Sequence, residues 1–232
     1  MRPVLRGDPP TDAAGNPVAL THYKDARDPL IARIGDYCSY CEVALHSTVD
    51  VEHVMPKSLN RVLTLEWSNF LIACTNCNSI KSNKPVRIAD YYWPDQDNTL
   101  RAFLYERDEP PQMATRGSAD STTTQRTLEL TGLDRVPGHP SFSDRDRRWQ
   151  KRMQAWSNAI LSHSNLAIID CPEMREQIII AAKATGFWSV WYHVFVRDRD
   201  MCERLIKAFV GTARDCFDPQ TLGVVARPGG AI

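Results

Sequence analysis

The sequence predicts an α+β protein in which a small cysteine-rich unit precedes a mainly helical second half. The first half holds two Cys-x-x-Cys pairs, at Cys38, Cys41, Cys74 and Cys77. Between them, the stretch "LHSTVDVEH" alternates apolar and polar side chains, which is typical of a strand or hairpin. After about residue 140, apolar residues recur instead at helical spacing, as in Trp149, Met153, Trp156 and Ile160.

The first half contains further elements around the cysteine-rich unit. "RDPLIARIG" predicts a short helix with Asp28 as its N-cap and Gly35 as its end. The mixed stretch 88–112 predicts a hairpin around an Asp-Asn turn, and "TRGSADS" predicts a loop. "TTTQRTLELTG" predicts a helix that ends at Gly132, and "DRVPGHPS" after it is a candidate domain boundary.

The second half predicts a helix that ends at Gly186 and another over "DRDMCERLIKAF", with Asp200 and Glu203 as a capping box. We expect four segments along the chain. They are an N-terminal arm with a short helix over 1–36, a cysteine-rich core over 37–95, a hairpin, helix and linker over 96–140, and a helical region over 141–232.

Composition narrows the class of protein. Apolar residues make up 43% of the 232, which predicts a packed core, and 28 basic residues balance 28 acidic ones. A neutral chain attracts nucleic acid only through a local basic patch. The sequence begins without an apolar signal segment and contains no run long enough to span a membrane, so we expect a cytoplasmic protein with no membrane partner.

The cysteines favour a metal site. In a reducing compartment, paired Cys-x-x-Cys motifs bind metal more often than they form disulfides. The two pairs together supply four thiolates for one structural Zn²⁺, although the segment between them is longer than in a common zinc ribbon. The alternative is two unrelated cysteine pairs. The other three cysteines are predicted to be small core residues: Cys171, Cys202 and Cys216.

A set of polar residues lies between the cysteine pairs and directly after the second pair. Glu52 and His53 are adjacent, Asn69 follows, and Asn78 comes nine residues later within a Cys-x-x-Cys-Asn-x-x-Lys string. A neutral histidine can take a proton from water, and carboxylate and amide oxygens suit Mg²⁺ or Mn²⁺. This pattern resembles the HNH nuclease family, whose core is a ββα-metal hairpin and helix.

The resemblance implies a role for each residue. Glu52 and Asn78 would bind the catalytic Mg²⁺ or Mn²⁺, His53 would be the general base, and Asn69 would hydrogen-bond the hairpin backbone. Zn²⁺ on the four cysteines would be structural. Asp50 is an alternative metal ligand because it lies two residues before Glu52 on the same strand face. The alternative role of Asn69 is that of a helix N-cap. His46, seven residues before His53, is expected to be a surface residue of the hairpin, and its alternative role is that of a metal ligand.

Basic residues near this core predict contacts with DNA. Lys57, Lys81 and Lys84 are candidates for phosphate binding, and Arg61 and Arg87 extend the patch. A second basic group precedes or begins the helical half and would form either a solvated helix face or a contact with the DNA backbone. Its members are Arg145, Arg147, Arg148, Lys151 and Arg152.

A narrower resemblance concerns biological role. The strings "YCSYCE", "VEHVMPKS", "LEWSNFLIACTNCNSIKSNKP" and "PDQDN" are similar to a bacterial HNH branch that includes the nuclease subunit of Septu-type antiphage defence systems. That branch implies an ATPase partner of the AAA or SMC-like type. A non-catalytic zinc-stabilised module that binds DNA or an ATPase is the alternative.

The helical half offers two apolar groups as the contact with such a partner, unless they fill the protein's own core. One group is the Trp188–Trp191 run. The other is the helix face of Met201, Leu205 and Phe209.

Overall fold

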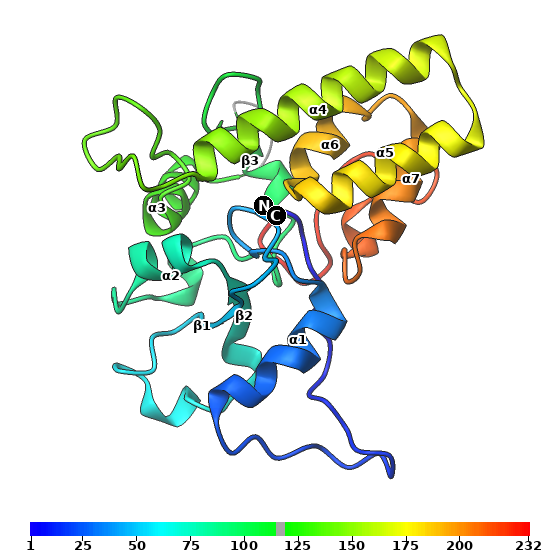
Figure 1. The fold of residues 1–232 in the computed structure, drawn as a ribbon. Coiled ribbons are helices and arrows are strands. Elements are labelled where there is room, and N and C mark those ends of the chain that lie inside the picture. The colour runs from blue at the N-terminus through cyan, green and yellow to red at the C-terminus, as the bar shows by residue number, and fades with distance from the viewer. Residues whose placement is uncertain (115–118) are drawn as a thin grey trace.

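The computed structural model describes residues 1–114 and 119–232, and it has the α+β architecture that the sequence predicts. Its helices in the described residues are α1 (Arg27–Ile34), α2 (Thr75–Lys81), α3 (Ser121–Thr131), α4 (Arg148–Ile168), α5 (Pro172–Thr185), α6 (Trp188–Val194) and α7 (Arg199–Ala208). Its strands there are β1 (Asp50–His53), β2 (Phe70–Ala73), β3 (Phe103–Leu104) and β4 (Gln112–Met113). The four helices α4 to α7 lie together on one side of the molecule, and β1, β2 and α2 lie on the other (Figure 1). The predicted loop over 115–121 falls largely outside the described residues.

The unit that positions the candidate site is a hairpin followed by a helix. β1 pairs with β2 in antiparallel register, so that His53 lies opposite Phe70 and Asp50 lies opposite Ala73. α2 begins directly after β2, with Cys74 as its N-cap residue. This order of strand, strand and helix is the ββα arrangement that the sequence resemblance implied.

The N-terminal arm enters α1 through a 3-10 turn over Tyr23–Ala26. His22 and Asp25 form a capping box on that turn, and the helix continues from it without a break. The prediction of Asp28 as N-cap was therefore wrong, because the turn supplies the first N–H partners upstream. The predicted end at Gly35 is confirmed, with a φ of 76°.

The predicted hairpin over 88–112 was wrong in position. The Asp97–Asn98 pair introduces a 3-10 turn over Thr99–Arg101, and only β3 and β4 pair beyond it. Asn98 does not cap a hairpin, because its amide donates to the carbonyls of Cys216 and Val225 near the other end of the chain.

The ends of two predicted helices are confirmed. α3 ends at Gly132, which is left-handed, and α5 ends at Gly186, with a φ of 71°. A Cβ at Gly186 would lie 2.5 Å from the backbone oxygen of Glu42, so glycine permits the close approach of α5 to the loop after Cys41. The predicted capping box was misplaced by two residues: Asp198 caps α7, while Asp200 pairs with Arg175 and Arg204.

The helical half packs α4 against α5 and α6, and α7 against α5 and α6. The Trp188 and Trp191 side chains are 1% and 0% exposed. The face of α7 is equally enclosed, as are two of the isolated cysteines: Met201, Leu205, Phe209, Cys202 and Cys216 are all buried, whereas Cys171 is partly exposed. The prediction that either apolar group contacts a partner was therefore wrong, because both fill the protein's own core.

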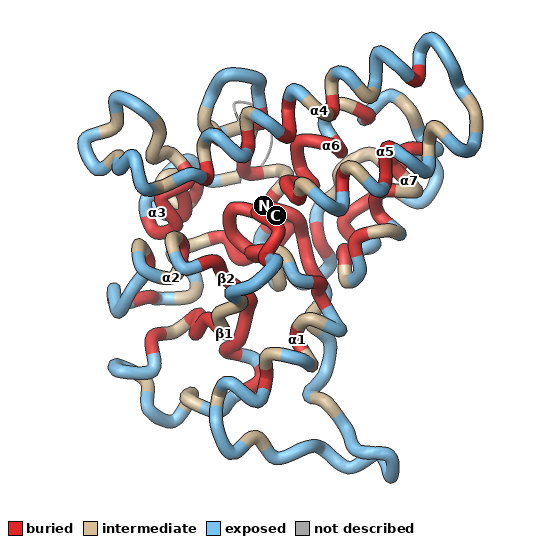
Figure 2. Tube along the Cα trace, in the orientation of Figure 1, coloured by how far each residue is buried: buried red, intermediate tan, exposed pale blue. Residues whose placement is uncertain are grey.

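Buried residues on both sides of the predicted boundary at 134–141 join one hydrophobic cluster (Figure 2). The cluster contains Phe70 and Leu71 of β2 as well as Trp156 of α4 and Trp191 of α6. None of the helices in the described part of the chain has the length and hydrophobicity needed to span a lipid bilayer.

Candidate metal centre and active site

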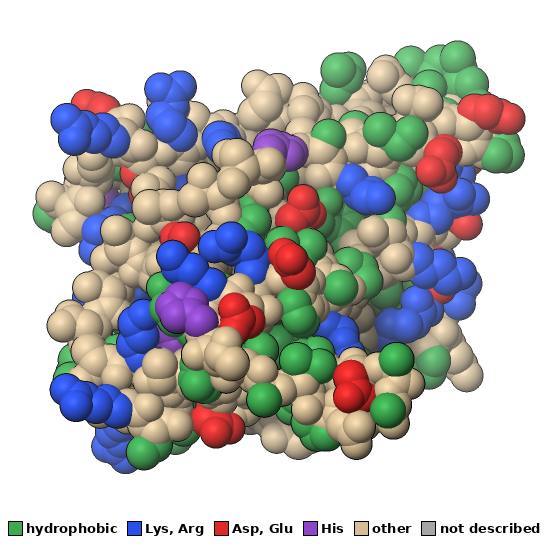
Figure 3. Space-filling model, turned by 60° about the horizontal axis from the view of Figure 1, so that its bottom comes forward, with side chains coloured by type: hydrophobic (Ala, Val, Ile, Leu, Met, Phe, Trp, Pro, Cys, Tyr) green, Lys and Arg blue, Asp and Glu red, His purple; other side chains and the backbone are tan. Residues whose placement is uncertain are grey.

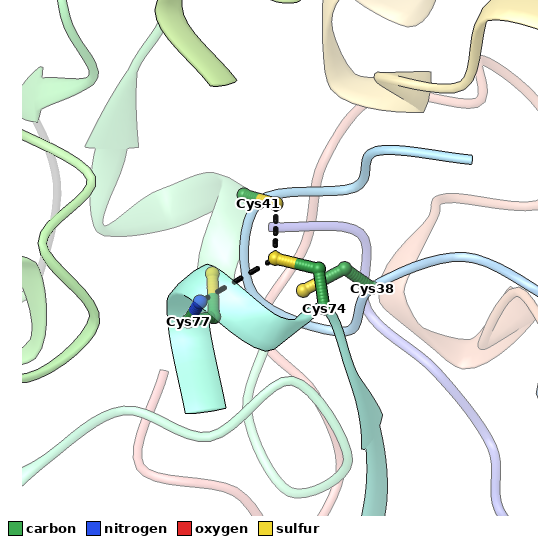
Figure 4. A group of neighbouring side chains, drawn as sticks. All are labelled: Cys38, Cys41, Cys74 and Cys77. Atoms are coloured by element: carbon green, nitrogen blue, oxygen red, sulfur yellow. Dashed lines mark hydrogen bonds between the residues drawn. The ribbon is translucent and has the colours of Figure 1, made fainter. Parts of the chain in front are cut away.

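The four paired cysteines meet at one point. Cys38 and Cys41 lie in the loop before β1, and Cys74 and Cys77 lie at the start of α2 (Figure 4). All four Sγ atoms lie within 4.8 Å of one another, and those of Cys41 and Cys74 are 3.7 Å apart. A tetrahedral Zn²⁺ with Zn–S bonds of about 2.3 Å would separate its sulfurs by about 3.8 Å. The long segment between the pairs is thus the β1–β2 hairpin.

The electrostatics of the four-cysteine cluster favour a bound cation. Burial raises the pKa of Cys41 and of Cys77 well above the ordinary value, while hydrogen bonds from Cys38, Cys41 and Cys77 lower the pKa of Cys74. Four adjacent buried thiols cannot all ionise by themselves, whereas a divalent cation removes that barrier. All four thiols are free rather than joined in disulfides. The four cysteines thus form a site that fits a metal ion.

Two arginines of α4 face this cluster. The Arg148 guanidinium donates to Cys77 Sγ at 3.1 Å and to the carbonyls of Thr131 and Gly132, and it pairs with Asp146. Arg152 is also buried, with its guanidinium over the Phe187 ring.

The prediction that the whole basic group forms a solvated or DNA-binding face was wrong for Arg148 and Arg152. A thiolate is a better partner for buried guanidinium than a neutral thiol, so both arginines favour ionised sulfur at the cluster.

A second polar group lies where β1 faces α2. We call it the carboxylate face, and it consists of Asp50, Glu52, Asn78 and Lys81. The Asn78 amide donates to Asp50 Oδ2 at 3.3 Å, and the Lys81 ammonium lies 2.7 Å from Glu52 Oε1. Asp50 and Glu52 share this face because they are two residues apart on a strand.

Glu52 is enclosed and incompletely satisfied. Its Oε1 atom is buried and has no aligned hydrogen bond, although the Lys81 ammonium is near it. Burial raises the pKa of Glu52 to about 7, against the opposing effect of Lys81. The Glu52 carboxylate is thus already paired with one cation, and together with Asp50 and Asn78 it offers the kind of oxygen ligands that Mg²⁺ or Mn²⁺ prefers. The residues present fit such an ion.

His53 points away from the carboxylate face. Its ring packs against the rings of Tyr23 and Phe70, with centroids 5.1 Å away in each case, and it is 8% exposed. Its Nε2 atom lies 3.1 Å from the Thr64 carbonyl oxygen, so in the neutral ring Nε2 carries the proton. Nδ1 then has a free lone pair, since no hydrogen bond to it occurs in residues 1–114 or 119–232. Burial, followed by the charges of Lys57 and Lys81, lowers the pKa of His53.

Asn69 ties the loop after His53 to the hairpin. Its Oδ1 accepts from the Met55 N–H at 2.7 Å, and its amide donates to the carbonyls of Met55 and Leu63. These are the backbone hydrogen bonds that the resemblance implied for Asn69. The residue ends a 3-10 turn rather than capping a helix. Because Leu63 adjoins Thr64, Asn69 also fixes the carbonyl that holds the His53 ring.

The three predicted phosphate-binding lysines have different settings. Lys57 and Lys84 are exposed, whereas Lys81 is 1% exposed and also donates to the His53 carbonyl. The setting of Lys81 supports a structural role in place of the predicted phosphate contact.

Lys57 and Arg61 line a surface hollow of about 570 Å³ that Tyr23 and Thr64 also border, so the hollow lies beside His53. We call it the His53 hollow. Figure 3 shows Lys and Arg side chains in several separate groups on one face of the molecule, some of them beside surface histidines.

Sequence reasoning missed two groups at His53. The Thr64 contact is made by a backbone carbonyl, which no side-chain pattern can reveal. Tyr23 comes from the N-terminal arm, where its ring lies 3.7 Å below the Lys57 ammonium as well as against His53. The only signal for Tyr23 was an aromatic residue in an otherwise polar segment.

Comparison with known proteins agrees with this geometry. The family model for HNH endonucleases matches residues 38–84, which span the four cysteines, the hairpin and α2. No curated protein matches the chain. Residues 38–84, called the HNH domain below, therefore match the HNH endonuclease family model, and this match supports a nuclease-type function.

Proposed function

We propose that the protein is a metal-dependent HNH endonuclease that cleaves DNA. The HNH match over residues 38–84 supports the class of activity. The environment of His53 carries the proposal, because the Thr64 carbonyl orients the ring through Nε2 and Nδ1 makes no hydrogen bond within the described residues. Tyr23 and Thr64, which both contact the ring, also border the hollow that Lys57 and Arg61 line. A histidine that served only in packing would need neither a fixed ring orientation nor basic residues close by.

The proposed chemistry is hydrolysis of one phosphodiester bond. His53 Nδ1 accepts a proton from water as the water oxygen attacks phosphorus, while Thr64 accepts the hydrogen bond from Nε2 and stabilises the imidazolium that forms. The bond from phosphorus to the 3′ oxygen breaks, and the departing oxygen takes a proton from solvent. Lys57 and Arg61 contribute positive charge where the phosphate enters.

Asp50, Glu52 and Asn78 would hold the catalytic Mg²⁺ or Mn²⁺. When bound, that ion neutralises the scissile phosphate and stabilises the leaving oxygen. The hydrogen bond between Asn78 and Asp50 supports Asp50 as a ligand beside Glu52, in addition to the pair that the sequence resemblance implied. Asn69 would be a positioning residue that holds the loop carrying His53 and Thr64.

The four-cysteine cluster would hold a structural Zn²⁺, with thiolates as its ligands. The enclosed position of the cluster favours a structural ion, because a catalytic zinc site keeps one coordination position open to water or substrate. The site would join the start of α2 to the loop before β1.

A plasmid-nicking assay with Mg²⁺ or Mn²⁺ tests the activity. Loss of a general base typically lowers the rate by about 10²–10⁴-fold, so we expect His53→Ala to fall by that amount while keeping its zinc content. His163→Ala removes an exposed histidine of α4 and is the matched control. Cleavage at the parent rate by His53→Ala, or no cleavage by the parent, would overturn the proposal, and the second result would favour a non-catalytic DNA-binding module.

We further propose that the cleavage serves antiphage defence together with an ATPase of the AAA or SMC-like type. The support is the order of strings over residues 37–95 that resembles the Septu-type branch. Protection of cells from phage by the parent operon, lost with His53→Ala, is the expected result. Equal protection with and without His53 would contradict it.

A further inference from the structure

A second hollow, distinct from the His53 hollow, lies between the HNH domain and the helical half. It has a volume of about 350 Å³ and is bordered by the loop before β1, the first residues of α2 and the segment that enters α4. We call it the basic groove. Its polar lining includes His46, Asn76, Arg145, Arg147 and Lys151.

The charged side chains that line the basic groove are all positive. Four cationic side chains line it, and no Asp or Glu does so among the described residues. Arg148 is occupied by Asp146 and Cys77, but Arg145, Arg147 and Lys151 are exposed and make no ion pair in the described part of the chain. By contrast, Arg175 on α5 is matched by three aspartates, Asp170, Asp198 and Asp200. A neutral protein that leaves three cations unpaired around one hollow has a surface suited to a polyanion.

The segment that carries these cations is held in place. Asp146 accepts from the Asn76 amide at 3.0 Å and from Arg148, which is itself anchored to the carbonyls of Thr131 and Gly132. Arg145 and Arg147 flank Asp146, so their backbone is fixed to α2 and α3 before any ligand arrives. Such preorganisation lowers the entropy cost of binding.

Two residues of the groove are also close in sequence to the carboxylate face. Thr48 and Asn76 line the groove, and they lie two residues before Asp50 and Asn78 of the carboxylate face. Ser47 and Thr48 add hydroxyl groups, which together with guanidinium and ammonium groups are the usual contacts to phosphate oxygens.

We propose that the basic groove binds the sugar-phosphate backbone of duplex DNA that flanks the cleavage site. The choice of DNA rests on the proposed function. The contact would extend the DNA-binding surface beyond residues 38–84 onto the helical half. Because its cations contact phosphates rather than bases, the groove would position DNA without selecting a base sequence.

Equilibrium binding separates this proposal from catalysis. In a His53→Ala background, a labelled DNA duplex is titrated in a salt series, with fluorescence anisotropy as the readout. We expect the triple variant Arg145→Gln, Arg147→Gln, Lys151→Gln to bind at least about tenfold more weakly, with the slope of log K against log salt shallower by up to about 3. The control triple variant removes the same charge from exposed residues outside the groove: Arg107→Gln, Arg197→Gln and Lys207→Gln. Zinc content and circular dichroism verify the fold of each variant.

The outcomes are distinct. Equal binding by the groove triple variant and the control triple variant would overturn the proposal, as would absence of DNA binding by the parent or tighter binding of an RNA duplex of the same sequence. If the triple variant does not fold, the single variant Arg145→Gln is measured, and an unchanged salt slope would overturn the proposal. Groove-dependent binding without any cleavage by the protein with intact His53 would support the groove and contradict the nuclease.

Discussion

The environment of His53 combines a fixed orientation with a low proton affinity. Thr64 accepts from Nε2, and the rings of Tyr23 and Phe70 enclose the imidazole. Burial is the largest cause of the lowered pKa, and the positive charges of Lys57 and Lys81 act in the same direction. Because this pKa lies below the ordinary value for histidine, the ring favours its neutral form, which is the form that accepts a proton.

This environment predicts the pH dependence of cleavage. Because protonation of His53 removes the base, the acid limb of kcat/KM should lie at lower pH than an unperturbed histidine would give. Lys57→Gln removes a nearby positive charge and should move this acid limb to higher pH. The measurement is the pH profile of kcat/KM for both proteins, with Lys24→Gln as a control from the same arm. An acid limb that does not respond to Lys57→Gln would separate His53 from the observed titration.

The carboxylate face predicts how metal dependence responds to mutation. Asp50→Asn and Glu52→Gln each remove one anionic ligand, so each should raise the Mg²⁺ or Mn²⁺ concentration for half-maximal cleavage by about tenfold or more. Asp36→Asn, at an exposed aspartate before Tyr37, is the control. Metal titrations of the cleavage rate give the values. A response of Asp50→Asn alone would remove Glu52 from the ligand set and leave it as the partner of Lys81.

At the scale of elements, α4 differs most from expectation. The helix begins at Arg148, whose side chain reaches Cys77 Sγ, two backbone carbonyls and Asp146. The start of α4 is thus bound to α2 and α3, and the cysteine cluster contacts the helical half as well as the HNH domain. The misplaced cap of α7 has a similar cause, since Asp200 pairs with Arg175 and Arg204 instead of capping the helix.

Arg148→Met should therefore destabilise the protein strongly. Removal of one partner of a buried charge pair usually costs about 3–5 kcal/mol of unfolding free energy. Arg147→Met, at the exposed neighbour of Arg148, should change it by less than about 0.5 kcal/mol. Urea unfolding followed by circular dichroism compares the two, and a chelator assay should show faster zinc loss from Arg148→Met. Equal stability of the two variants would show that the contacts of Arg148 make no net contribution to the free energy of unfolding.

At the scale of the whole molecule, one hydrophobic cluster joins the two halves. The HNH domain of residues 38–84 is short for independent folding, and the sheet at its centre has two strands. Its buried residues pack with those of the N-terminal arm and the helices, and Arg148 adds a polar link. These contacts support the proposal that the HNH domain depends on the rest of the chain for its stability.

Cys74→Ser, or zinc removal by a chelator, tests this dependence. Structural zinc contributes folding free energy directly. Both treatments should therefore lower the temperature of the thermal transition together with the zinc content of the protein. We expect a single transition that moves as a whole, because the core is continuous. Cys171→Ser is the control, since Cys171 lies outside the cluster and is partly exposed. A helical half that keeps its own unchanged transition after chelation would establish two independent domains.

The sequence by itself determined that the four cysteines would gather and which polar residues lie near them. The cysteine pairs met as expected, and Asn69 made the backbone hydrogen bonds that the resemblance implied. These features are readable because the residue types are chemically distinctive and because a hairpin followed by a helix brings together residues that are close in sequence. Glycine at positive φ likewise marked the ends of α3 and α5.

Only the tertiary structure decided which of the remaining residues are buried and what they contact. A helical pattern shows that Met201 and Leu205 share an apolar face, but it does not show that the same chain covers it. Charge patterns did not reveal that Lys81 pairs with Glu52 or that Arg148 reaches Cys77, because both contacts depend on how a helix lies against another element. The physical reason is that burial and ion pairing are properties of packed surfaces, which residues far apart in sequence form together.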